Sequence, residues 1–224
     1  RRFAYTDSVS KNNEKKETMK TFIAATALFI AATATSACEY GDHDININFQ
    51  NATPVESACD GAITAIKFFE QAGYGDYAFV INVTVADEVY TYMCDQDGND
   101  GEAVRVFGLY DGAVNQITIS ALGTEYMSTR TAWNTDPKDD TSGMPITEEI
   151  WTSVITHEVA HALATQIYNT QNPVLKSNGY PIEPGVSEYI AYFIQLATTR
   201  PELRDEIVAS FGDIGPFQYT ENLN

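Results

Sequence analysis

Residues 155–163 read ITHEVAHAL, and this stretch decides how the rest of the chain is interpreted. His157 and His161 lie four residues apart, and Glu158 follows the first of them. On an α-helix, such a pair is separated by about 40° around the axis and about 6 Å along it. Both imidazoles therefore project from one face and can bind one tetrahedral Zn²⁺ ion. The spacing predicts a helix that carries a zinc site, with one ion per chain.

Glu158 has a different role from the two histidines. It lies about 100° further round the helix, so it cannot comfortably share the metal, but it can reach a water molecule bound there. Zinc lowers the pKa of such a water towards neutrality, and a neighbouring carboxylate can take its proton and pass it to a leaving amine. The pattern therefore predicts hydrolysis of peptide bonds by a zinc-activated water, with Glu158 as the general base.

A catalytic zinc site needs a third protein ligand. In the longer HExxHxxGxxH pattern, glycine and histidine would stand where this chain has Ala164 and Ile167, so that class is excluded. A carboxylate on a following helix remains, and Glu188 is the best candidate because it opens an apolar helix that must pack against the first. Glu183 and the distant His43 are the alternatives.

The helices predicted around this site make up the C-terminal part of the chain. Thr147 is a good N-cap, with acidic residues directly after it, and apolar spacing continues the helix to about Asn169. A second helix is predicted at 186–198 and a third, which Pro201 opens, to Ser210.

The residues before this part are predicted to form mostly strands. The first, Asp44–Phe49, alternates apolar and polar residues, and a helix follows at 55–75. Strands that come first and helices that come last indicate an α+β domain. The loop at 95–101 is interpreted as a hairpin connection rather than a calcium site. The further predicted strands are residues 78–85, 88–94, 104–110 and 115–120.

The HEVAHAL helix followed by SEYIA at 187–191 resembles the gluzincin branch of the HExxH zinc metallopeptidases. The chain is more similar still to small exported bacterial proteins of unassigned function that have an HE-x-AHA helix and a later EYIA segment. This resemblance implies that His157, His161 and Glu188 bind zinc and that Glu158 is the base. It also implies a zincin-like fold, with a small, mainly antiparallel sheet over the HExxH helix.

Two features depart from the best-known gluzincins. Glu188 follows His161 at a longer interval, and Tyr192 stands where many members carry an aspartate that orients a histidine. With no further histidine near the motif, a tyrosine is expected to stabilise the oxyanion. The candidates are Tyr168, Tyr180, Tyr189 and Tyr192.

The N-terminal residues are predicted to be a leader and an export signal. Residues 1–18 are polar and lack periodicity, so we interpret them as a disordered leader or a mis-assigned start. Residues 19–37 have the layout of a secretory signal peptide, with one lysine, an apolar run and small residues at the end. Residues 38–224 are then a single metallopeptidase domain, located in the periplasm or secreted.

The chain has three cysteines, and export favours a disulfide between two of them. Cys38 directly follows the small residues of the signal, which is typical of lipid-anchored bacterial proteins. If Cys38 carried a lipid, Cys59 and Cys94 would remain as the natural disulfide, and this is the pairing we expect.

The acidity of the chain limits its partners. Lys and Arg number 13 against 31 Asp and Glu, which gives a formal net charge of −18. Such a surface repels nucleic acid and anionic membranes, so neither nucleic-acid binding nor membrane insertion of the mature domain is expected. The expected partner is a peptide or protein substrate. The alternative function is a zinc-binding envelope or binding protein that keeps the site with little or no turnover.

Overall fold

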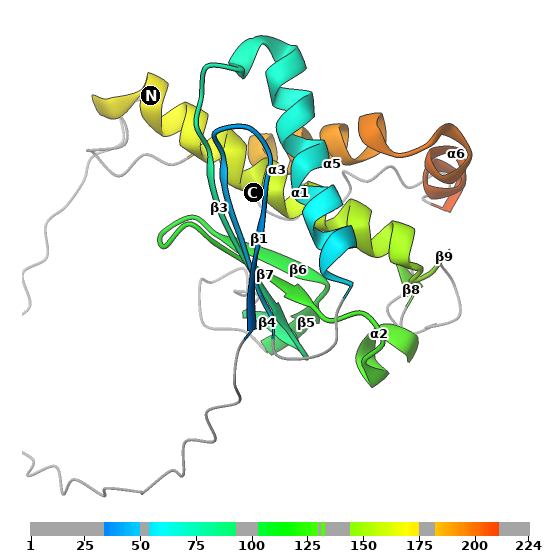
Figure 1. The fold of residues 1–224 in the computed structure, drawn as a ribbon. Coiled ribbons are helices and arrows are strands. Elements are labelled where there is room, and N and C mark those ends of the chain that lie inside the picture. Colours follow the sequence, from blue (N-terminus) through cyan, green and yellow to red (C-terminus); the bar gives the residue numbers. More distant parts are fainter. Residues whose placement is uncertain are drawn as a thin grey trace, which may run out of the picture. The chain divides into compact units, whose positions relative to one another are not determined.

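The computed structural model describes residues 34–49, 54–92, 103–129, 131–132, 144–174 and 182–210, all of which belong to one compact unit spanning residues 31–224 (Figure 1). The strands are β1 (Ala34–Cys38), β2 (Asp44–Phe49), β3 (Val80–Ala86), β4 (Val89–Tyr92), β5 (Ala103–Val106), β6 (Gly108–Asp111), β7 (Gln116–Ser120), β8 (Thr131–Ala132) and β9 (Met144–Pro145). The helices are α1 (Val55–Phe69), the π-helical turn η1 (Glu70–Tyr74), α2 (Glu125–Thr129), α3 (Glu148–Gln171), α5 (Pro184–Thr198) and α6 (Pro201–Ser210).

The fold is α+β with a small sheet, as predicted, but the sheet is mixed rather than mainly antiparallel. Its strand order is β1-β2-β3-β7-β6. The three middle strands run parallel, and the two edge strands, β1 and β6, run antiparallel to their neighbours. The cause is the position of α1 in the chain: parallel strands need a crossover, and α1 with η1 supplies the one between β2 and β3.

The strand predicted at 104–110 is interrupted at Phe107. Its first half, β5, pairs with β4 in a separate two-stranded sheet, whereas its second half, β6, joins the edge of the main sheet beside β7. The Phe107 carbonyl accepts a hydrogen bond from the Ser120 amide at 2.8 Å, which holds this change of partner against the end of β7.

Helix α3 is the centre of the fold. Thr147 caps it as predicted, because its side chain accepts a hydrogen bond from the Ile150 amide. The helix packs against α1, α5, β6 and β7, and residues on all its sides are buried along its middle. The indole of Trp151 donates to the Ser120 carbonyl at 2.8 Å and so ties the start of α3 to the end of β7.

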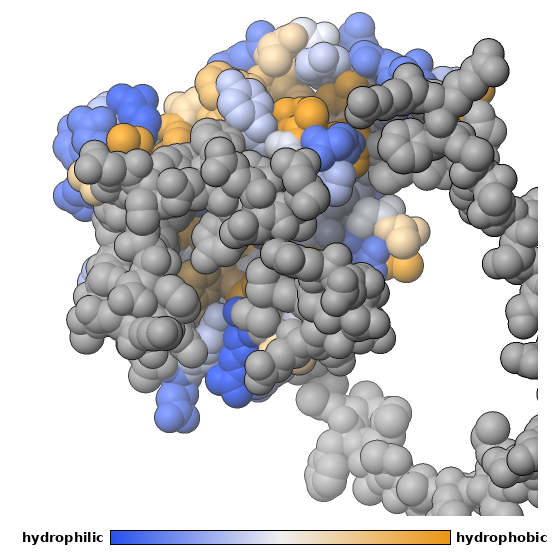
Figure 2. Space-filling model, turned by 180° about the vertical axis from the view of Figure 1, so that it is seen from behind, coloured by the Kyte–Doolittle hydropathy of each residue, from blue (hydrophilic) through white to orange (hydrophobic). Residues whose placement is uncertain are grey.

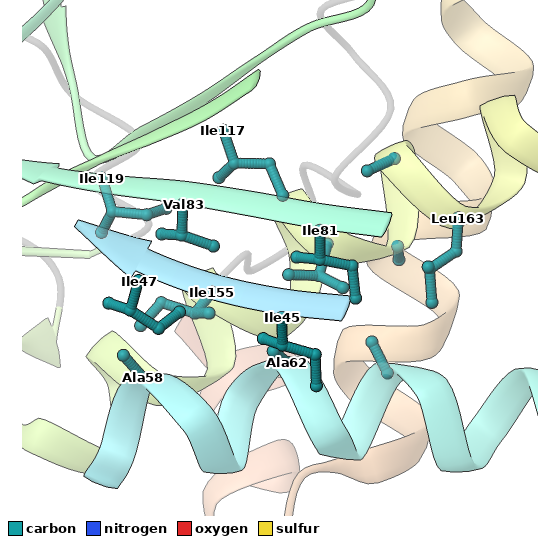
Figure 3. Close-up of a cluster of buried hydrophobic side chains, with 14 of the residues drawn as sticks. Ile45, Ile47, Ala58, Ala62, Ile81, Val83, Ile117, Ile119, Ile155 and Leu163 are labelled. Carbon is teal, nitrogen blue, oxygen red and sulfur yellow. The ribbon is translucent and has the colours of Figure 1, made fainter. Parts of the chain in front are cut away.

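The core lies between the sheet and two helices, and Figure 3 shows its side chains. Alternate residues of the three parallel strands point inward, and each fully buried Ile or Val contributes about 1.5–3 kcal/mol of transfer free energy. The labelled residues of this core are Ile45, Ile47, Ile81, Val83, Ile117 and Ile119 from the sheet, with Ala58, Ala62, Ile155 and Leu163 from α1 and α3.

Helix α6 packs against the N-terminal end of α3. Its Leu203 and Ile207 form a small buried cluster with Ile150. Its Glu202, Asp205 and Glu206 are exposed, and Figure 2 shows strongly hydrophilic residues gathered on this side of the molecule, on the left of the view. No helix in the described part of the chain is long and apolar enough to cross a membrane.

A disulfide joins Cys38 at the end of β1 to Cys59 in α1. The predicted disulfide is therefore present, but its predicted pairing of Cys59 with Cys94 is wrong. Pairing of β1 with β2 places Cys38 opposite Ile45, where its side chain points into the core beside α1. The same bond occupies the Cys38 sulfur that a lipid anchor at this residue would need.

Several predicted segments fall wholly or partly outside the described residues. They are the leader 1–18, residues 19–33 of the signal peptide, and the loop at 95–101 with Cys94 before it. Residues 34–37, the last four of the predicted signal peptide, lie in β1.

Candidate metal centre

His157 and His161 meet on the face of α3 that is turned towards α5. Their Nε2 atoms are 3.1 Å apart, and their rings meet edge to face. Both residues are buried, with 8% and 7% of their surface exposed. The structure therefore brings the predicted pair together as the helical spacing requires.

Glu188 joins the pair from the second turn of α5. Its two carboxylate oxygens each lie 3.5 Å from one histidine, Oε2 from Nε2 of His157 and Oε1 from Nε2 of His161. Possible ligand atoms of these three residues all lie within 4.8 Å of one another. Two neighbours explain this position: the Glu183 side chain caps α5 at the Val186 amide, and the small, fully buried Ala191 lets α5 approach α3 closely.

The three residues fit a zinc ion. Two nitrogens bound at about 2.0–2.1 Å to one tetrahedral ion lie roughly 3.4 Å from each other. The observed separations of 3.1 and 3.5 Å are close to this value. Two imidazoles and one carboxylate are also a common donor set of catalytic zinc. The Glu188 side chain is 51% exposed, which leaves the solvent side of the cluster open.

Each histidine has a hydrogen-bond partner at its other nitrogen. Nδ1 of His157 lies 3.2 Å from Oε1 of Gln195, and Nδ1 of His161 lies 2.7 Å from Oγ of Ser187. Both partners come from α5, the helix that also provides Glu188. Neither residue was predicted from the sequence. Their available signal was position: Ser187 precedes Glu188, and Gln195 follows it by two helical turns on the same face.

Glu158 lies on the other side of the cluster, against strand β6. It is 8% exposed, and its carboxylate accepts a hydrogen bond from the Tyr110 backbone amide. Burial raises the pKa of Glu158, although the neighbouring His157 and His161 act in the opposite direction. A buried carboxyl with a raised pKa is suited to accept and release a proton.

The space for Glu158 depends on Gly108. A Cβ atom added at Gly108 would lie 2.6 Å from Cγ of Glu158, so β6 can approach α3 here only without a side chain. Two residues further along β6, the ring of Tyr110 lies parallel to that of His161 at 6.5 Å. Strand β6 therefore forms a wall for both Glu158 and His161.

The pKa of Glu188 is shifted in the opposite direction to that of Glu158. Burial alone would raise its pKa, but the adjacent His157 and His161 outweigh this effect and hold the pKa of Glu188 well below its usual range. The carboxylate is therefore ionised at neutral pH and ready to bind a cation.

The two alternative ligands are occupied elsewhere. Nδ1 of His43 accepts a hydrogen bond from the Phe79 amide, and its Nε2 faces Glu70 at 3.3 Å. Glu183 caps α5. Among the described residues, the group that could hold a metal is the one formed by His157, His161 and Glu188.

The tyrosines considered for the oxyanion are in different places. The Tyr192 ring meets His157 edge to face at 4.5 Å, which places it beside the cluster. Tyr189 is exposed and stacks on Phe193. Tyr168 is partly buried further along α3, and Tyr180 lies outside the described residues. Tyr192 is therefore in contact with a predicted ligand.

Comparison with known proteins assigns the chain to a family. Residues 45–224 match the model of DUF6639, a family of unknown function, so the chain belongs to this family. The matched region includes all the residues of the cluster. Searches of curated proteins and of solved structures found no match.

Proposed function

We propose that the protein is an exported zinc-dependent peptidase of the gluzincin type. The observation that carries the proposal is the convergence of His157, His161 and Glu188, with the buried carboxyl of Glu158 on the same turn of helix. Zinc is the ion that this donor set favours.

Each residue then has a defined task. When bound, zinc supplies a Lewis acid that makes a water molecule acidic near neutral pH and polarises the substrate carbonyl. Glu158 takes a proton from the attacking water as its oxygen bonds to the carbonyl carbon. The C–N bond then breaks, and Glu158 delivers that proton to the amine nitrogen. The products are a carboxylate and an amine.

The position of the cluster in the fold supports a zincin-like architecture. The HExxH helix α3 lies beneath the edge strand β6, and the third predicted ligand, the carboxylate of Glu188, comes from the next described long helix, α5. Export is supported by the Cys38–Cys59 disulfide, since such bonds persist in oxidising compartments. It is also supported by the predicted signal peptide.

A zinc-binding protein with little turnover is the second candidate. The observation that favours it is the burial of Glu158, whose carboxylate bonds to the β6 backbone rather than facing open solvent. To act as a base, Glu158 must either leave its hydrogen bond with the β6 backbone or accept the proton in its buried position.

Two measurements on the same preparations separate these functions. Zinc per chain is measured by mass spectrometry, and hydrolysis is measured with a mixed peptide library. A peptidase gives one zinc and cleavage in the wild type, zinc without cleavage in Glu158→Gln, and loss of zinc in Glu188→Ala. Glu202→Ala is the matched control, because Glu202 is an exposed glutamate on α6.

The other possible results also decide between the two functions. One zinc with no cleavage across the library would support the binding protein. Cleavage retained in Glu158→Gln would contradict its role as base. No zinc in the wild type after reloading would contradict both functions.

A further inference from the structure

Gln195 is a buried side chain that uses both ends of its amide. It is 2% exposed, and its Oε1 lies 3.2 Å from Nδ1 of His157. Its Nε2 donates to Oγ of Ser153 at 3.1 Å, and the Ser153 hydroxyl donates to the Ile150 carbonyl at 2.7 Å. A chain of hydrogen bonds thus runs from the backbone of α3 to a predicted metal ligand.

These hydrogen bonds can run in only one donor-to-acceptor direction. A carbonyl oxygen only accepts, so the Ser153 hydrogen is committed to Ile150 and Oγ is left to accept. The amide nitrogen of Gln195 must therefore face Ser153, and the amide oxygen must face His157. Nδ1 of His157 then carries the hydrogen, and Nε2 keeps its lone pair. That nitrogen is the one that faces His161 and Glu188.

The partner of His161 imposes no such direction. The Ser187 hydroxyl can donate or accept, so His161 can exist in either tautomer. Since Nε2 of His157 has no hydrogen, Nε2 of His161 is the donor across the 3.1 Å between them when no metal is bound. Nδ1 of His161 then accepts from Ser187. Binding of an ion needs both Nε2 lone pairs, so the His161 hydrogen must move to Nδ1.

We propose that Gln195 is a positioning residue that presets His157 for metal binding, whereas Ser187 lets His161 change tautomer when the ion arrives. The proposal rests on the proposed function for the identity of the ion, but the tautomers of the metal-free protein follow from hydrogen bonds alone. A neutral amide orients His157 here without adding a third negative charge beside Glu158 and Glu188.

The direct test is ¹⁵N NMR of the histidine rings in the wild-type protein. In metal-free protein, above the titration range of histidine, we expect the hydrogen on Nδ1 of His157 and on Nε2 of His161. After zinc is added, both hydrogens should be on Nδ1. A hydrogen on Nε2 of His157 in the metal-free protein would overturn the proposal.

Variants test the same point through zinc affinity, measured by competition with a chromogenic chelator. Gln195→Met keeps the volume but removes the acceptor, and zinc affinity should fall about 10–100-fold. Gln195→Glu keeps an acceptor towards His157 and should retain the affinity. Gln166→Met is the matched control, because Gln166 bonds to the Val80 backbone away from the cluster.

The variant results decide the proposal in the following way. Unchanged zinc affinity in a folded Gln195→Met protein would contradict it, and circular dichroism establishes folding. If the wild type binds no zinc, the proposed function fails, whereas the metal-free tautomers still decide the role of Gln195.

Discussion

At Gly108 the proposed catalytic carboxyl lies against a residue without a side chain. A methyl group there would be 2.6 Å from Cγ and 2.7 Å from Oε1 of Glu158, and 2.9 Å from Ile119. These contacts are too short to persist, so the Glu158 side chain or strand β6 must move. The position of Glu158 is thus set by β6 as much as by its own helix.

Gly108→Ala should therefore lower peptidase activity without removing the metal. A displacement of about 1 Å in a catalytic group can reduce the rate about 100-fold. Zinc per chain should stay at one, because the ligands come from α3 and α5. Gly112→Ala is the control, since a Cβ there would make only an ordinary contact with Tyr110, at 3.5 Å. Equal kcat/KM in both variants would contradict the close approach.

The raised pKa of Glu158 predicts how the stability of the metal-free protein depends on pH. Because the folded state holds the proton more tightly than the unfolded state, the stabilising effect is present at low pH and is lost as pH rises through the raised pKa. Glu158→Gln cannot ionise, so it should melt at a higher temperature than wild type at neutral pH. The difference should shrink as pH falls through the raised pKa, and a constant difference would contradict the shift.

The site could be predicted from the sequence only in part. Helical geometry fixes the relation between His157, Glu158 and His161, so these residues can be chosen from spacing alone. Glu188 followed from the need for an acid on a helix that packs against the first. Gln195 and Ser187 could not be chosen, because the partner of a ring nitrogen depends on how α5 lies across α3, and spacing does not encode that angle.

At the scale of elements, the contact between α1 and α3 depends on Gly61. The Gly61 carbonyl accepts a hydrogen bond from the Thr156 hydroxyl at 3.0 Å, next to the first histidine. A Cβ atom at Gly61 would lie 2.8 Å from the Thr152 carbonyl oxygen and 2.9 Å from Cβ of Ile155. Both are backbone-fixed atoms, so α1 would have to move away.

Gly61→Ala should therefore destabilise the protein, although alanine is the better helix former. Overpacking of this kind costs about 1–3 kcal/mol, against a gain of up to about 1 kcal/mol in helix propensity. The free energy of unfolding, measured in urea, should fall. Gly75→Ala is the control, because nothing lies within 4 Å of a Cβ there. A Gly61→Ala protein as stable as wild type would show that α1 can shift freely.

The elements themselves were largely predictable, but their pairing was not. The N-cap residue Thr147 and the helical spacing of apolar residues located α3, and the alternation of apolar and polar residues located β2, because these signals are local in the sequence. The alternation at 104–110 is continuous, yet β5 and β6 take different partners. Strand direction likewise depends on the crossover through α1, which is a non-local feature. The prediction of a mainly antiparallel sheet was wrong for this reason.

At the scale of the whole molecule, the disulfide ties the edge of the sheet to the helical layer. Cys38 ends β1, the strand at one edge of the main sheet, and Cys59 lies in α1. The bridge spans 21 residues, which include β2. It therefore closes a loop around the first half of the β2–α1–β3 crossover, on the side of the core away from β6.

Removal of this bridge should weaken the fold while leaving the metal cluster intact. Closing a loop of 21 residues stabilises the folded state by about 3 kcal/mol through the entropy of the unfolded chain. Cys59→Ser should lower the free energy of unfolding by about that amount, and the folded variant should still bind one zinc. Cys94→Ser is the control, because Cys94 lies outside the bridge. Peptide mapping by mass spectrometry identifies the pairing, and destabilisation of similar size in Cys94→Ser, with a Cys59–Cys94 peptide in the wild type, would contradict the bridge.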